Sequence, residues 1–284
     1  MECCKVNDTI FFNKEDMLVK RVFTYWVNAP GASMPAYLDL CMSTWKKYIP
    51  DLEIVVINHD NLSEWIDDSQ WVNASRDIER FKRIGYMLQS DIVSQLVLVK
   101  HGGIFMDADT IITKDIFDEI NTFDPDSLIA FGKPGLCYIH VAIQIALNPG
   151  NSFLSAVSHE ATIKLNNLPQ ESQTINWDFF SNSIYSSVYE DESIRKCLHL
   201  LDRQETGNIL ESHYFTALDT MAQYVRFYFE PHKISVKEAL KKVKFGAISL
   251  HNSFTPDPYK ELSQEQVLEK KDCMLSKILK RLLA

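Results

Sequence analysis

Residues 102–112 read Gly102-Gly103-Ile104-Phe105-Met106-Asp107-Ala108-Asp109-Thr110-Ile111-Ile112, an apolar strand pattern interrupted by two carboxylates. Alternate residues of a strand point to the same face, so the pattern predicts that Asp107 and Asp109 converge while Ala108 points away. Two carboxylates on one face repel each other unless a cation lies near them, and hard oxygen ligands favour Mg²⁺ or Mn²⁺. An Asp-x-Asp triplet also arises by chance as solvated charge or a turn. The apolar setting favours the metal site, because unpaired buried carboxylates are costly.

The elements before this strand indicate the architecture around it. Strands are predicted over 22–27 and 53–58 from their apolar, β-branched composition. A helix is predicted between Pro35 and Pro50, and a second, longer one over 76–101, ended by Gly102-Gly103. This alternation predicts an α/β domain with a largely parallel sheet. A metal at the carboxyl end of such a strand lies where ligands bind, and a diphosphate is the natural further ligand.

Later elements are less sharply patterned. Strands are expected at 128–131, 141–146, 225–229 and 245–250, and a helix over 151–166. The predicted organisation is an N-terminal extension over 1–20, one main domain over 21–258, and a C-terminal segment over 259–284.

Two stretches carry a family resemblance: Ser90-Asp91-Ile92-Val93, and Lys100-His101-Gly102-Gly103 continuing to Asp109. They resemble the DxD-type sugar transferases of glycosyltransferase family 32, and their capsular polysaccharide synthesis branch in particular. Residues 23–26 and 40–51 fit as well, so the best match covers roughly residues 21–120, with weaker echoes at 206–207, 227–231 and 251–254. The resemblance implies a GT-A fold, a single α/β domain with a Rossmann-like central sheet. It also implies metal-dependent transfer of a hexose or N-acetylhexosamine from a UDP-sugar to a glycan acceptor, with retained anomeric configuration.

The resemblance also implies roles for individual residues. Asp109 would be a direct ligand of Mn²⁺ or Mg²⁺, with Asp107 and His251 completing the metal site. Asp107, with the neighbouring Ala108, would also lie against the ribose and sugar. Asp91 would hold hydroxyls of the donor sugar, so that Asp91, Asp107 and Asp109 form the catalytic group.

The same resemblance places Tyr25 or Trp26 in a uracil pocket, where an aromatic face suits stacking. A tryptophan on a strand is more often part of the core, a lone histidine such as His251 is more often structural, and an aspartate such as Asp91 is more often solvated. The family commonly carries an arginine three residues after the aspartate of the Ser-Asp pair, where this chain has Ser94.

Two other functions stay open at this stage. One is a toxin-like transferase that modifies a protein. The other is a catalytically inactive protein that only binds a sugar nucleotide, for which Ser94 is the motivation.

The C-terminal segment has its own pattern. Apolar residues recur at helical spacing over 267–283 with lysines and an arginine around them, which predicts a basic amphipathic helix. Such a helix can lie on an anionic membrane surface and bring the enzyme to a lipid-linked glycan acceptor. It can also dock on the main domain or in a dimer.

Composition limits the remaining possibilities. Lys+Arg number 29 against 38 Asp+Glu, a formal net charge of −9, which argues against nucleic-acid binding. No run of 18 apolar residues is present, and the first residues do not resemble a signal peptide. The six cysteines are scattered without a C-x-x-C pair, which favours reduced thiols. The expected location is the cytoplasm, with peripheral membrane contact through 267–283 as an open possibility.

Overall fold

A computed structural model describes residues 21–66, 81–82, 84–136, 138–166 and 179–284. Its central sheet has six strands in the order β2-β1-β3-β6-β5-β7. Their bounds are β1 (Arg21–Tyr25), β2 (Glu53–Ile57), β3 (Gly103–Met106), β5 (Leu128–Lys133), β6 (Tyr138–Ala146) and β7 (Leu198–Asp202). β1 runs parallel to β2 and β3, and β5 parallel to β7, while β6 is antiparallel to both its neighbours. The predicted α/β class with a largely parallel sheet is therefore confirmed.

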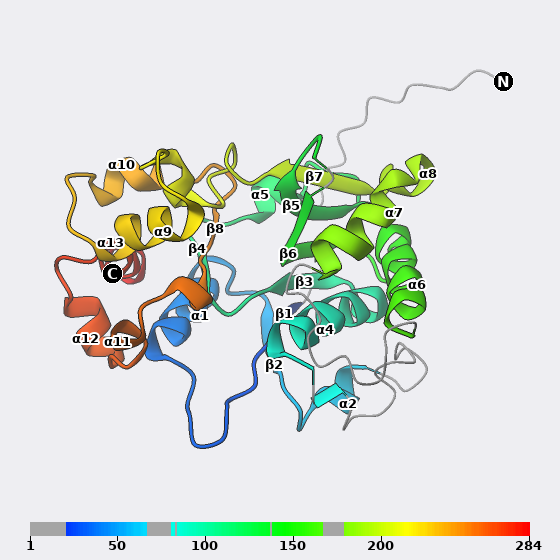
Figure 1. Cartoon of the computed structure of the whole chain (residues 1–284), viewed down its shortest axis with the longest axis horizontal. Helices are drawn as coiled ribbons and strands as arrows, with labels where there is room; N and C mark the ends of the chain where they lie inside the picture. The colour runs from blue at the N-terminus through cyan, green and yellow to red at the C-terminus, as the bar shows by residue number, and fades with distance from the viewer. Residues whose placement is uncertain (1–20, 67–80, 83, 137, 167–178) are drawn as a thin grey trace.

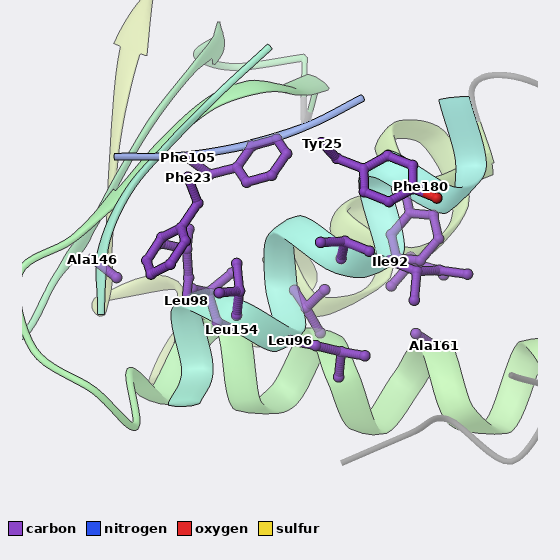
Figure 2. Close-up of a cluster of buried hydrophobic side chains, with 14 of the residues drawn as sticks. Phe23, Tyr25, Ile92, Leu96, Leu98, Phe105, Ala146, Leu154, Ala161 and Phe180 are labelled. Atoms are coloured by element: carbon purple, nitrogen blue, oxygen red, sulfur yellow. The ribbon is translucent and has the colours of Figure 1, made fainter. Parts of the chain in front are cut away.

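One face of this sheet is covered by α4 (Tyr86–His101), α6 (Ser152–Asn166) and a π-helical segment, Phe179–Tyr185. Figure 2 shows Phe23 of β1 directed toward Leu98 of α4 and Leu154 of α6, and Phe105 of β3 belongs to the same apolar cluster. Three short helices lie at the rim: α2 (Leu62–Trp65), α7 (Ser186–Glu190) and α8 (Glu192–Arg195). The continuous apolar strands are explained by burial on both faces of the sheet.

The opposite face is covered by α1 (Ala36–Tyr48), α5 (Phe117–Ile120) and a small two-stranded sheet, β4 (Thr110–Ile112) with β8 (Ala247–Ser249). α1 holds β4 by two buried hydrogen bonds. The Trp45 indole donates to the Thr110 carbonyl at 2.7 Å, and the Ile112 amide donates to the Thr44 hydroxyl at 2.9 Å. These bonds fix the strand that leaves the Asp-x-Asp triplet.

The C-terminal helices gather at one side of the molecule, away from α4 and α6 (Figure 1). They are α9 (Thr220–Phe229), α10 (Val236–Leu240), α11 (Asp257–Lys260), α12 (Gln264–Glu269) and α13 (Met274–Leu283). Instead of one helix over 267–283, the chain forms α12 and α13, because Lys270 and Cys273 leave helical geometry between them. The expected boundary near residue 258 falls inside α11, and residues of α12 and α13 share one apolar cluster with α1 and α9.

The apolar face of α13 is covered by the chain itself. Leu275, Ile278 and Leu279 are fully buried, and α13 packs against α1, α9, α10 and α12. Of the two interpretations of the tail, docking on the main domain is the one that this packing supports. Apolar insertion into a membrane would require these side chains to leave the core.

We expect Leu279→Ala to lower the free energy of unfolding by about 2–5 kcal/mol, the usual cost of removing a fully buried leucine. The neighbouring exposed Lys280→Ala should change it by less than about 0.5 kcal/mol. Urea unfolding of both variants measures the difference. Equal stability of the two variants would show that α13 is not part of the core.

Two other local predictions are corrected. The predicted strand at 225–229 belongs to helix α9: Asp219 caps it by accepting the Ala222 amide at 2.9 Å, and Tyr224, Phe227 and Tyr228 are buried at helical spacing. The predicted helix over 76–101 is interrupted: Phe81 and Lys82 are helical, Ile84 and Gly85 are not, and α4 begins at Tyr86. Its residues 76–80 and 83 lie outside the described residues, as does the extension 1–20.

No helix within the described ranges is long and apolar enough to span a bilayer. Cys41, Cys197 and Cys273 carry free thiols. The other three cysteines fall outside the part of the chain that the structure describes.

Candidate active site

The Asp107-Ala108-Asp109 triplet is a turn rather than part of a continuous strand. The Thr110 amide donates to the Asp107 carbonyl at 2.9 Å, and the chain passes here from β3 of the large sheet to β4 of the small one. The Asp107 amide donates to the Ala142 carbonyl of β6 at 2.8 Å, which anchors the start of the turn. The two carboxylates thus come together by a tight turn, and not by the strand alternation that the sequence predicted.

Asp109 is joined to the segment around His251. β4 and β8 are antiparallel with Thr110 opposite Ser249, so Asp109 faces the residues that follow β8. The Leu250 amide donates to the Asp109 carbonyl at 3.3 Å, and the Asn252 amide donates to the Asp109 carboxylate at 2.8 Å. His251 therefore lies between two residues that are both hydrogen-bonded to Asp109, as its predicted place near the carboxylates requires.

Asp91 approaches the triplet from α4. The preceding residue, Ser90, donates its hydroxyl to the Asp107 carboxylate at 3.4 Å. The Asp91 and Asp107 side chains are only partly exposed, whereas Asp109 is buried at 8% exposure. The structure thus brings Asp91, Asp107, Asp109 and His251 into one neighbourhood from three separate parts of the chain.

The electrostatics of these carboxylates are unfavourable in the metal-free protein. Burial raises the pKa of all three carboxyl groups, Asp91, Asp107 and Asp109. The negative charge of Asp107 raises the pKa of Asp91 further, and the negative charge of Asp109 raises the pKa of Asp107 further. The Asn252 amide, with the nearby His251 and Arg203, works in the opposite direction and lowers the pKa of Asp109. A further positive charge at this place would relieve the remaining penalty.

The donor set fits a hard divalent cation held jointly with a ligand. Carboxylate oxygens are the ligands that Mg²⁺ and Mn²⁺ prefer, and an imidazole nitrogen beside them suits Mn²⁺ better than Mg²⁺. Within the described residues, no three His, Cys, Asp or Glu side chains are close enough to hold a metal by themselves. A cation would therefore take some of its ligands from a bound phosphate group, as Mg²⁺ commonly does with substrate phosphates.

The aromatic residues predicted for a base pocket lie in different environments. Tyr25 is buried in the apolar cluster of Figure 2, and its hydroxyl donates to Gln89 at 2.5 Å. Trp26 follows the end of β1 and is partly exposed, with its indole donating to Asn28 at 2.8 Å. Ala108 is buried within the turn. Of the two aromatic residues, Trp26 has the surface on which a base could stack.

Ser94 belongs to a buried polar network instead of a charged one. Its hydroxyl donates to the Asp91 carbonyl at 2.9 Å and accepts from Gln144 at 3.1 Å. Gln144 in turn accepts from the Tyr185 hydroxyl. Because these side chains fill the space, an arginine at position 94 would displace Gln144 or Tyr185.

Sequence reasoning missed a second set of buried polar residues near His251. Arg203 follows β7 and is 8% exposed; it donates to the Asn208 side chain at 3.1 Å, and its Nη2 has no hydrogen-bond partner among the described residues. Glu211, in the short helical turn Leu210–His213, is also buried. The only sequence signal near this loop was the weak family similarity at Thr206-Gly207.

The strands and the carboxylate turn of the N-terminal half lie in a region that is similar to a family of sugar-polymer synthesis proteins. The family profile described as "Capsular polysaccharide synthesis protein" matches residues 5–135, just under half of the chain, and confirms the predicted resemblance. No curated protein matches the chain.

Several solved structures of glycosyltransferases are similar to the chain at low identity and with TM-scores below 0.5. The PaToxG glycosyltransferase is 13% identical with a TM-score of 0.43, over 93% of this chain and 86% of that one. A glycosyltransferase involved in glycosylation of the major capsid of PBCV-1 is 10% identical with a TM-score of 0.41, over 86% and 98%. Mouse xyloside xylosyltransferase 1 is 10% identical with a TM-score of 0.45, over 84% and 99%.

Proposed function

We propose that the chain transfers a hexose or N-acetylhexosamine from a UDP-sugar to a glycan acceptor in surface polysaccharide synthesis, with the aid of Mn²⁺ or Mg²⁺. The observation that carries the proposal is the pair of hydrogen bonds that join Asp109 to Leu250 and Asn252 on either side of His251. These bonds hold the Asp109 carboxylate and the His251 segment together, next to the carboxyl groups of Asp91 and Asp107. The pKa values of Asp91 and Asp107 are both raised. The capsular polysaccharide synthesis profile supports the class of product.

In this proposal Asp109 and His251 hold the cation, with Asp107 beside them. The bound metal would supply positive charge to the donor diphosphate and stabilise it as it leaves. The partly exposed Trp26 is the candidate for stacking on the uracil. Its own ring nitrogen is occupied by Asn28, so it would contribute its face rather than a hydrogen bond.

Asp91 would position the donor sugar. Burial and the charge of Asp107 raise its pKa, which favours the protonated carboxyl over a wider pH range than for an exposed aspartate. A protonated carboxyl both donates and accepts hydrogen bonds, as does each sugar hydroxyl. The side chain is partly exposed, so a ligand in the site can reach it.

Retention of configuration determines on which face of the anomeric carbon the new bond forms. The bond between the anomeric carbon and the diphosphate oxygen breaks, and the acceptor oxygen forms its bond to that carbon on the same face. The proton of the acceptor hydroxyl passes to the leaving diphosphate, so no separate protein base is needed. A product of inverted configuration would contradict this route.

The acceptor is proposed to be a growing glycan, free or on a lipid carrier. With the apolar face of α13 buried, contact with an anionic membrane would rest on the exposed cations of α13 and the turn before it, Lys270, Lys271, Lys277, Lys280 and Arg281. Such contact would be electrostatic and should disappear at high salt.

Mn²⁺ binding should strengthen as the pH rises. The pKa values of Asp107 and Asp109 are raised by burial, so protons and the cation compete for the same oxygens through the neutral range. Affinity should increase by up to about tenfold per pH unit for each proton displaced. Calorimetric titration of Mn²⁺ with UDP present, at about pH 6 and about pH 8, measures this. Equal affinity at both pH values would place the cation elsewhere.

The function is tested by UDP release from a panel of UDP-sugars with Mn²⁺, with and without a glycan acceptor. We expect slow donor hydrolysis for one sugar, faster turnover with the acceptor, and loss of both on chelation. UDP-sugar binding without turnover under any condition would support the inactive sugar-nucleotide binder instead. Transfer to a protein and not to a glycan would support the toxin-like alternative.

A further inference from the structure

The carboxylate of Glu211 is buried next to His251, and the proposed function gives it no role. Glu211 Oε1 lies 3.3 Å from His251 Nε2, and the two side chains are 2% and 17% exposed respectively. The other oxygen, Oε2, is buried without a hydrogen-bond partner among the described residues. Leaving a carboxylate in this state is expensive, so its retention needs a reason beyond packing.

Other buried polar groups surround Glu211. Arg203 is buried nearby; burial lowers the pKa of its guanidinium, and the charges of Glu211 and Asp109 act in the opposite direction. The Tyr228 hydroxyl is buried on the same side, and the charge of Glu211 raises the pKa of that hydroxyl. His251 is the side chain nearest to Glu211 for which an ion-pair distance is found.

The imidazole is held from several directions at once. The Tyr224 and Phe254 rings pack against it at centroid distances of 5.3 and 5.2 Å. Its flanking residues, Leu250 and Asn252, are tied to Asp109. Nε2 lies at ion-pair distance from Glu211 but forms no hydrogen bond to a described residue. A cation bound at Nδ1 would leave the ring proton on Nε2, where Glu211 can accept it. Metal-bound histidines very commonly use their second nitrogen to bond a carboxylate in this way.

We propose that Glu211 is a positioning residue, which holds the His251 ring through Nε2 so that Nδ1 is presented to the divalent cation. The proposal rests on the proposed function, because it presumes that His251 is a ligand of the cation. It extends that function by assigning a role to a residue outside the Asp-x-Asp turn. The negative charge of Glu211 also makes the imidazole a stronger electron donor.

The test measures Mn²⁺ affinity directly, by titration calorimetry or by the electron paramagnetic resonance signal of free Mn²⁺, with UDP present. Glu211→Gln is nearly isosteric and removes only the charge, and we expect it to weaken Mn²⁺ binding about tenfold. Glu211→Leu should approach the upper end of the 10–100-fold loss that is usual for such partners. The matched control is Glu205→Gln, an exposed glutamate in the same loop, which should bind Mn²⁺ normally.

A double-mutant cycle separates positioning from a general structural effect. In the His251→Ala background, Glu211→Gln should cause no further loss of Mn²⁺ affinity, because its effect passes through the histidine. Normal affinity of Glu211→Gln, or the same loss with and without His251, would overturn the proposal and leave the proposed function standing. Absence of Mn²⁺ binding in the unmodified chain would instead overturn the metal-dependent function, and the proposal with it.

Discussion

Asp109→Asn should reduce turnover of the UDP-sugar by about 10³-fold or more, equivalent to roughly 4 kcal/mol of transition-state stabilisation. Asparagine keeps the shape of the side chain and can still accept the Asn252 amide, so the turn should stay in place. What it removes is the negative charge that would hold the cation against the diphosphate. Because burial already disfavours the ionised carboxyl, the free energy of unfolding should change by less than about 1 kcal/mol.

The measurement is steady-state UDP release at saturating Mn²⁺, together with urea unfolding of the same preparations. Asp118→Asn is the matched control, since Asp118 is an exposed aspartate in α5 on the strand connection that follows the site. It should retain full activity. Full activity of Asp109→Asn would remove the Asp-x-Asp turn from the catalytic site.

Gly207→Ala should destabilise the chain by about 2–5 kcal/mol. Gly207 has φ of +73°, and a Cβ atom there would lie 2.2 Å from the Lys242 carbonyl oxygen and 2.8 Å from the Val243 Cα. The left-handed conformation costs an alanine about 1–2 kcal/mol, and overpacking against backbone adds about 1–3 kcal/mol. The Thr206 carbonyl accepts the Lys244 amide at 2.8 Å, so the loop cannot move away without losing that bond.

Gly135→Ala separates the two contributions. Gly135 has a similar φ of +84°, but nothing lies within 4 Å of its added Cβ, so only the conformational cost of about 1–2 kcal/mol remains. Urea unfolding of the two variants gives the difference. If both lose the same stability, the Lys242 contact is not the reason for glycine at position 207.

Sequence reasoning reached five of the six strands of the central sheet because they are short, apolar and separated by clear breaks, but it missed β7. The Asp-x-Asp triplet and His251 were singled out by the family resemblance and stay predictions, whereas the backbone geometry expected for the triplet was wrong. Strand alternation predicted the convergence of Asp107 and Asp109, whereas a turn between two sheets produces it. Periodicity cannot distinguish one continuous strand from two short strands joined by a three-residue turn, as between β3 and β4.

The C-terminal part was less predictable for a different reason. Residues 225–229 are aromatic and β-branched, which favours a strand, but the burial of Tyr224, Phe227 and Tyr228 along one face and the Asp219 cap make a helix. Glu211 and Arg203 gave no local signal at all. Their proximity to His251 exists only after the loop following β7 folds beside β8.

The turn at Asp107–Asp109 connects β3 of the large sheet directly to β4 of the small sheet. Asp107 is tied to β6 of the large sheet through the Ala142 carbonyl, while Asp109 is tied to the segment after β8 of the small one. A ligand that contacts Asp107 and His251 together therefore bridges two separately hydrogen-bonded layers. Such a ligand would add its binding free energy to the packing that already joins the two layers, and so raise the stability of both together.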